Sequence, residues 1–133
     1  MEHSLKIKNR QILWVDSEDI REMEMESDRI LKRLDGCTAC VCYNDEVANK
    51  MVGICMDQGI RIPEDLSIIG IDDSDLSRFC EIPFTSARNP VRELGRIAAE
   101  MMIGRIRGFT EIETVELEPE LIMRSSVKVI NHI

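Results

Sequence analysis

The sequence predicts an α/β fold built on a parallel sheet with helices on both faces. Three short apolar runs alternate with helical patterns, which is the order of a sheet built from right-handed strand–helix–strand units. A polar residue follows each of the three runs, at positions 16, 44 and 72, and so with an even spacing of 28 residues. The 133 residues are enough for one ordinary domain.

The three candidate strands are residues 11–15, 38–43 and 66–71. Each run is rich in β-branched or aromatic residues and is bounded by polar or turn residues. Because their apolar residues are almost continuous, we expect strands that are covered on both faces, as in parallel sheets. Further strand-like runs lie at residues 82–89, 112–117 and 121–123.

Apolar residues at helical spacing separate the candidate strands. One helical pattern covers residues 20–34, and a second covers residues 47–55 and ends at Gly59, where we expect a left-handed cap. Residues 74–81 predict one or two helical turns. Pro90 opens a last helix, in which its missing N–H removes no hydrogen bond. The apolar face of this helix contains Val91, Leu94, Ala98, Met101 and Met102.

The charge of the chain excludes some partners. Seventeen Lys and Arg residues stand against 25 Asp and Glu residues, which gives a formal net charge of −8. Such an acidic domain repels phosphate, so we expect this chain itself to contact neither DNA nor an anionic membrane. It contains no apolar run long enough to span a bilayer, and its start lacks the apolar core of a secretory signal. We therefore expect a cytoplasmic protein.

The five cysteines favour reduced thiols in a chain of this kind. The close spacing of Cys37, Cys40 and Cys42 raises the question of a zinc site, which needs four ligands. Only His3 and His132, at the two ends of the chain, could add imidazoles. We therefore interpret the thiols as small buried hydrophobic groups, and expect no metal site and no cofactor.

Asp16, Asn44 and Asp72 directly follow the first three candidate strands. The carboxyl ends of parallel strands share one edge of a sheet, and ligands bind in the crevice there. Carboxylates accept hydroxyl protons, and asparagine both donates and accepts, so this edge suits a polyhydroxylated ligand. The pattern indicates sugar recognition rather than catalysis. Helix capping is the alternative role for Asn44, and it is also open for Asp16.

An enzyme is a less favoured hypothesis. Asp72 and Asp73 could hold Mg²⁺ or act as acid and base in a metal-assisted hydrolase, but adjacent side chains generally diverge. The sequence contains no glycine-rich phosphate loop, nucleophile elbow or set of serine, histidine and aspartate. We therefore predict that the chain is not an enzyme.

Five motifs in order resemble the C-terminal half of the effector domain of the lactose/galactose (LacI/GalR) repressor family. They are YNDEVA at 43–48, GIRIPEDLSIIGIDD at 59–73, FTSARNP at 84–90, the segment 93–99 and EPELIMRSS at 118–126. The variant CYND at 42–45 most resembles the arabinose-responsive repressors, which pair this domain with a DNA reader of the GntR type. The resemblance covers almost the whole chain.

This resemblance implies a periplasmic-binding-protein-like fold of type I, with two lobes and a small effector, such as the monosaccharide arabinose, in the cleft. Effector binding then changes the lobe orientation and, through a homodimer, the DNA affinity of a separate N-terminal domain. Asn44 and Asp72 would face the ligand, with further contacts from Asp16 and from Asn89. The expected dimer contacts are Val47, Met51, Phe79 and Cys80. A sugar-binding protein of a transport system is the alternative.

The resemblance also implies an incomplete lobe, because a complete effector domain is about twice this length. Residues 1–89 would form part of the C-terminal lobe, residues 90–118 would be a crossover helix and strand of the other lobe, and residues 119–133 a return strand and tail. The resemblance places the DNA-binding domain outside this chain. For the helix that follows Pro90 we expect repacking, exchange between two chains, or an exposed apolar patch.

Overall fold

The computed structural model describes residues 12–14, 20–109 and 114–130. Its core element is an open four-stranded sheet in which the strands follow one another in chain order. The first three strands are parallel, and the fourth is antiparallel to the third. This confirms the predicted α/β fold. The strands are β1 (Ala39–Val41), β2 (Ser67–Ile71), β3 (Thr85–Arg88) and β4 (Glu120–Ile122).

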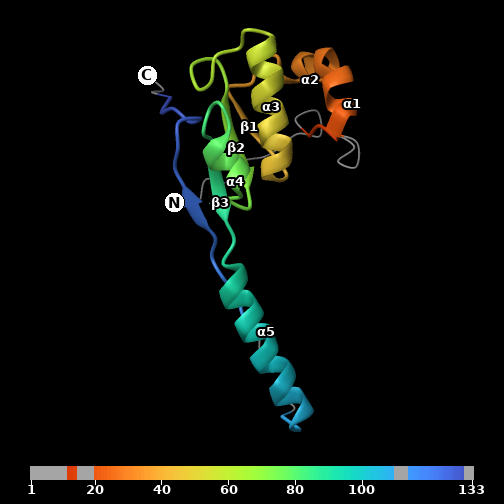
Figure 1. The fold of residues 1–133 in the computed structure, drawn as a ribbon, viewed down its shortest axis with the longest axis vertical. Helices are drawn as coiled ribbons and strands as arrows, with labels where there is room; N and C mark the ends of the chain where they lie inside the picture. Colours follow the sequence, from red (N-terminus) through yellow and green to blue (C-terminus); the bar gives the residue numbers. More distant parts are fainter. Residues whose placement is uncertain (1–11, 15–19, 110–113, 131–133) are drawn as a thin grey trace.

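Five helices connect or flank these strands in the described part of the chain (Figure 1). They are α1 (Ile20–Met25), α2 (Ser27–Leu34), α3 (Asp45–Asp57), α4 (Asp75–Phe79) and α5 (Val91–Ile106). The single helical pattern over residues 20–34 is thus divided at Glu26. The predicted end of α3 is confirmed, because Gly59 has a φ of +70° and the Ile60 N–H donates to the Cys55 carbonyl at 2.8 Å.

Two of the strand-like runs do not form strands in the residues described. Residues 12–14, from the run at 11–15, have no regular secondary structure, although Leu13 packs against the core. Residues 114–117, from the run at 112–117, are likewise not in a strand. Apolar content alone predicted both runs, but a strand also needs a hydrogen-bonded neighbour, which these described residues lack.

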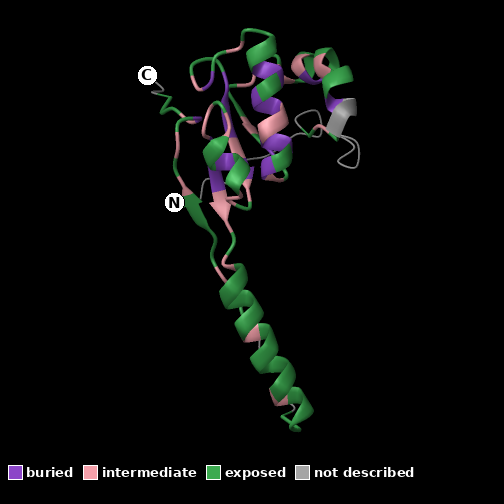
Figure 2. Ribbon diagram, viewed as in Figure 1, coloured by how far each residue is buried: buried purple, intermediate pink, exposed green. Residues whose placement is uncertain are grey.

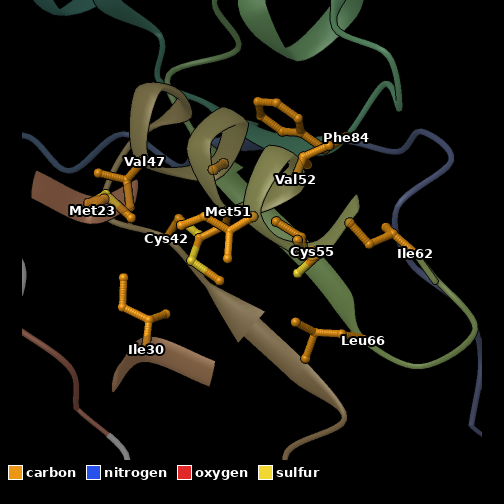
Figure 3. Packing of buried hydrophobic residues seen from close by; sticks show 13 residues of the cluster. Met23, Ile30, Cys42, Val47, Met51, Val52, Cys55, Ile62, Leu66 and Phe84 are labelled. Atoms are coloured by element: carbon orange, nitrogen blue, oxygen red, sulfur yellow. The ribbon is translucent and has the colours of Figure 1, made fainter. Parts of the chain in front are cut away.

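The hydrophobic core lies between α3 and the sheet (Figure 3). Val47, Met51 and Val52 from α3 pack with Ile68 of β2 and with the ring of Phe84 just before β3. The interpretation of the cysteines as buried hydrophobic groups fits two of them, since Cys42 and Cys55 belong to this core. All five cysteines are free thiols.

Only one face of β1 is covered by the described residues. Cys40 is half-buried and Cys42, just after the strand, is buried in the core beneath α3, whereas Ala39 and Val41 on the opposite face are exposed. The expectation of burial on both faces therefore does not hold for β1. The reason is that no described helix packs on the face that carries Val41, 70% of which is exposed.

Helix α5 leaves the body of the protein after β3 and has no buried residue along its length (Figures 1 and 2). The chain returns through residues 114–119 to β4, which pairs with β3. In this single chain, apolar side chains of the helix form an exposed patch. The patch contains Val91, Leu94, Met101, Met102, Ile103 and Ile106. No described helix is both long enough and apolar enough to cross a membrane.

Candidate functional site

A cleft of about 810 Å³ opens beside the carboxyl ends of β1 and β2, between the start of α3 and the short helix α4. Asn44 and Asp72, the residues that follow these two strands, both line it, so the structure brings them to one edge of the sheet. Among the residues that the structure describes, no lysine or arginine lines the cleft. The other lining residues are Asp45, Glu46, Asn49, Ser74, Asp75, Leu76, Phe79 and Cys80.

Asn44 caps α3. Its backbone is extended, and its Oδ1 accepts a hydrogen bond from the N–H of Val47 at 2.9 Å. The cap satisfies one of the N–H groups that a helix start leaves unpaired. The Asn44 Nδ2 makes no hydrogen bond to another described residue, so it keeps two donors for a ligand in the cleft. Capping and ligand binding are therefore compatible at this residue.

Asp45 fixes the wall of the cleft from inside. It is buried, and one carboxylate oxygen accepts from the Ser86 hydroxyl at 2.6 Å. The other accepts from the N–H of Ser74 at 2.6 Å and from its hydroxyl at 2.9 Å. These bonds tie the start of α3 to β3 and to the residue before α4. The sequence alone did not indicate these bonds of Asp45, because both serines are distant in the chain.

Asp72 has an unusual backbone conformation for a residue other than glycine, with a φ of +108°. Its N–H donates to the Ala87 carbonyl at 2.8 Å, which anchors the loop to β3. Its exposed carboxylate lies next to Asn89, whose Nδ2 donates to Oδ1 at 3.4 Å. Backbone strain of this kind costs about 1–3 kcal/mol and is concentrated at functional sites.

Only 2% of the side chain of the neighbouring Asp73 is exposed, and this side chain binds three guanidinium groups. Arg88 lies at 2.7 Å, Arg78 at 3.0 Å, and Arg124 also forms an ion pair with it. Burial alone would raise the pKa of Asp73, but the hydrogen bonds from Arg124, Arg88 and Arg78 outweigh it and hold the pKa well below its usual range.

This arrangement gives Asp72 and Asp73 different surroundings. Asp72 lines the cleft. The carboxylate oxygens of Asp73 instead bind Arg78 of α4, Arg88 of β3 and Arg124, which follows β4. Among the described residues, no three or more histidine, cysteine, aspartate or glutamate side chains are arranged to hold a metal ion. Sequence reasoning missed the arginine cluster, because its members lie up to 51 residues from Asp73 and carry no local signal.

The other predicted site residues have different positions. Asp16 lies outside the described residues. Val47 and Met51, for which we expected dimer contacts, are buried in the core of this chain, where their side chains pack. Phe79 is 82% exposed. Cys80 is half-buried, and its thiol donates to the Ile82 carbonyl at 3.0 Å.

Residues 2–127 match the family model of the periplasmic binding protein-like domain. Among curated proteins, the chain is 36% identical over 106 residues to the HTH-type transcriptional repressor PurR of Vibrio atlanticus (strain LGP32), which covers 79% of this chain and 32% of the relative. It is 42% identical over 93 residues to the arabinose metabolism transcriptional repressor of Geobacillus stearothermophilus, covering 68% of this chain and 26% of the relative.

Solved structures show the same likeness. The transcriptional regulator CelR in complex with cellobiose superposes with a TM-score of 0.80 at 26% identity, over 92% of this chain and 38% of that one. The regulator CcpA of Lactococcus lactis has a TM-score of 0.70 at 27% identity, over 83% of this chain and 40% of that one.

The chain thus spans about a third of the length of the curated relatives that it matches. The match to the family model nevertheless covers nearly all of its residues. The chain belongs to the family of periplasmic-binding-protein-like domains, and within it to the effector-binding domains of LacI-type transcriptional regulators.

Proposed function

We propose that this chain is the sugar-sensing and dimerisation module of a transcriptional repressor. Effector binding favours one arrangement of two lobes, and the DNA affinity of a domain outside this chain changes with it. Relatives named as repressors support the regulatory part of this proposal. A structural neighbour in complex with cellobiose, and a relative named for arabinose metabolism, support a sugar as effector.

We base the proposed class of ligand on the residues that line the cleft. Three exposed carboxylates, from Glu46, Asp72 and Asp75, line it together with the amides of Asn44 and Asn49. Because no lysine or arginine of the described residues lines the cleft, a phosphate or carboxylate on the ligand would meet only like charge there. Hydroxyl groups instead donate to carboxylates in short, strong hydrogen bonds. A neutral, hydroxyl-rich molecule such as a monosaccharide therefore fits best, and arabinose is our candidate.

The path of the chain supports a division between two lobes. We assign residues 1–89 and 119–133 to one lobe, and residues 90–118, with α5, to the other. Asn89 then stands at the crossing between the lobes, next to Asp72. On this proposal the cleft seen here is one wall of the effector site, and the second wall comes from the other lobe.

The proposed homodimer rests on α4. Phe79 exposes 82% of its surface and Leu76 exposes 40%, and both lie on this short helix. An aromatic side chain with this much exposed surface contributes little to the stability of the single chain, but such side chains are typical of protein interfaces. Cys80 adjoins Phe79 and would lie at the edge of the same contact.

Calorimetry on the intact repressor tests the proposed ligand class. We expect neutral monosaccharides, arabinose among them, to give binding heat, and the corresponding sugar phosphates to give none. Asp72→Ala should abolish that heat, whereas Asp28→Ala, which removes an exposed carboxylate from α2, should leave it unchanged. Equal binding of sugar phosphates, a nucleoside as the preferred ligand, or unaltered affinity of the Asp72 variant would contradict the proposal.

A further inference from the structure

We propose that Cys40 and Cys42 form a redox-active dithiol, which a hydroperoxide converts into an intrachain disulfide. The two sulfur atoms lie 3.9 Å apart and share a hydrogen bond. The proposal concerns a chemical modification of β1 and does not rest on the proposed sugar-sensing function.

The strand itself brings the two thiols together. Side chains at alternate positions point to the same face of a strand, and Cys40 lies in β1 with Cys42 directly after it. Two residues of extended backbone span about 6.6 Å, which falls within the range of roughly 4.4–6.8 Å between the Cα atoms of disulfides. The sulfur atoms can therefore bond after side-chain rotation and a small adjustment of the backbone.

The other three thiols lack such a partner. Of the five cysteines, all within the described residues, only Cys40 and Cys42 form a hydrogen bond with each other's sulfur. The Cys80 thiol instead donates to the Ile82 carbonyl. Cys55 is buried in the core, and burial raises its pKa to about 11, so it stays protonated.

The two partners differ in reactivity. The hydrogen bond from the Cys42 thiol stabilises a thiolate at Cys40 and lowers the pKa of Cys40, although burial opposes this. That same bond and burial raise the pKa of Cys42. Cys40 is also half-buried, whereas Cys42 is only 3% exposed. Because the thiolate is the nucleophile, Cys40 reacts with the oxidant first.

The reaction proceeds in two balanced steps. The Cys40 thiolate attacks one oxygen of hydrogen peroxide, the O–O bond breaks, and the products are a sulfenic acid and, after protonation, water. The Cys42 thiol then attacks the sulfenic sulfur, forms the S–S bond and loses its proton, and the hydroxyl leaves as a second water. Two electrons pass from the thiol pair to the peroxide in total.

Oxidation would alter the start of the cleft. The Cys42 sulfur belongs to the core beneath α3, while the Cys42 N–H donates to the Ile69 carbonyl at 2.8 Å. Forming the bond draws this sulfur toward Cys40 and shifts it within the core cluster that it shares with Met51 and Val52 of α3. Asn44, which caps α3, follows Cys42 by two residues. Oxidation of Cys42 would therefore also affect the backbone segment that contains this cap.

The test treats the folded chain with hydrogen peroxide, blocks the remaining thiols with an alkylating reagent, and measures intact mass and tryptic fragments. We expect the fragment of residues 34–50 to lose two hydrogen atoms and to retain one alkylated cysteine, Cys37. Dithiothreitol should restore all three alkylation sites. The variants Cys40→Ala and Cys42→Ala should each prevent the loss, whereas Cys37→Ala should retain it.

Three results would overturn the proposal. One is a bond that joins Cys37 to either partner in the wild-type chain, and another is a bond to Cys55. The third is a Cys40–Cys42 disulfide that forms only when urea unfolds the chain, which would show that the two thiols do not react in the folded chain. The dithiothreitol reversal uses the wild-type chain alone, so it remains informative even if the Cys42 variant folds poorly.

Discussion

At the end of β1, Asn44 combines two tasks that a sequence pattern cannot separate. Its Oδ1 accepts from the Val47 N–H and so holds the start of α3, while its Nδ2 remains available on the side of the cleft. Aspartate would supply the same cap, since Asn and Asp are about equally good at this position. Only asparagine, however, offers a donor to a ligand.

This difference predicts the behaviour of two variants. Asn44→Asp should keep the free energy of unfolding close to that of the wild type but weaken sugar binding at least tenfold, because a donor is lost and a negative charge is added. Asn44→Ala should also lower the free energy of unfolding by about 1 kcal/mol. Urea unfolding and calorimetry separate the two effects. Full sugar affinity in the Asp variant would assign Asn44 to capping alone.

The buried carboxylate of Asp73 stabilises the fold through its arginines. Asp73→Asn keeps the side-chain shape but leaves Arg124, only 13% of which is exposed, without its counter-charge. We expect the free energy of unfolding to fall by about 2–3 kcal/mol. The matched control is Asp65→Asn, which breaks an exposed pair with Arg61 and should change stability little. Equal effects of the two variants, measured in urea, would contradict this account.

The same carboxylate gives the stability a pH dependence of known sign. Because the pKa of Asp73 is lowered in the folded state, its contribution is fully present above the unfolded-state pKa of about 3.9 and is lost as the pH falls further. The stability difference between wild type and Asp73→Asn should therefore be constant near neutral pH and shrink below about pH 4.

Gly70 in β2 is required by close packing and not by its backbone angles. A Cβ at this position would collide with the Asp45 carboxylate and lie 2.8 Å from the Phe84 ring. We expect Gly70→Ala to lower the free energy of unfolding by about 1–3 kcal/mol. Gly53→Ala in α3 is the control, since its Cβ meets nothing within 4 Å, and it should stabilise by about 0.5–1 kcal/mol. Thermal or urea unfolding that ranks the two the other way would refute this packing.

At the scale of elements, α3 and α5 differ in the interactions that stabilise them. Seven residues of α3 are buried against the sheet or the loops, whereas α5 buries none. Within α5, Arg96 pairs with Glu93 at 2.5 Å and with Glu100 at 2.7 Å, but exposed ion pairs of this kind add little to stability. Tertiary packing supplies most helix stability in proteins, so α5 is the least protected of the longer helices.

Hydrogen exchange tests this difference directly. In the 133-residue chain, we expect amide protection in α5 to be at least tenfold lower than in α3, because opening α5 exposes no packed surface. The amides of Met51 and Val52 give the reference, since both residues are buried. Equal protection in the two helices would mean that α5 packs against something in solution, as in the repacked or exchanged arrangement.

The helices were predicted better from the sequence than the strands. The end of α3 at Gly59 and the start of α5 after Pro90 follow from local backbone chemistry, which a single sequence contains. Residues 12–14 of the run at 11–15 form no strand, because strand formation depends on a neighbour that periodicity does not reveal. The division at Glu26 between α1 and α2 likewise has no clear sequence signal, since the apolar spacing continues across it.

For the whole molecule, topology explains why part of the site was predictable. The parallel order of β1 and β2 makes Asn44 and Asp72 neighbours at one edge, and an even spacing is enough to infer it. The serine partners of Asp45 and the arginine partners of Asp73 depend on how distant segments pack, so no local pattern indicated them.

At the scale of the whole molecule, the described residues leave apolar surface uncovered. Helix α5 has no buried residue, and 70% of Val41 on β1 is exposed. On our proposal, a second lobe covers α5 and closes the cleft, so the 133 residues alone should bind sugar only weakly.

Nuclear magnetic resonance on the 15N-labelled chain measures such weak binding most directly. With millimolar arabinose or another neutral monosaccharide, we predict saturable shifts in the amides of Asn44, Asn49 and Asp72, and none in the exposed ends of α2 and α5. The sugar phosphates should cause no shifts at the same concentration. Shifts that avoid these three amides, or that appear equally with the phosphates, would contradict an acidic cleft built for a hydroxyl-rich ligand.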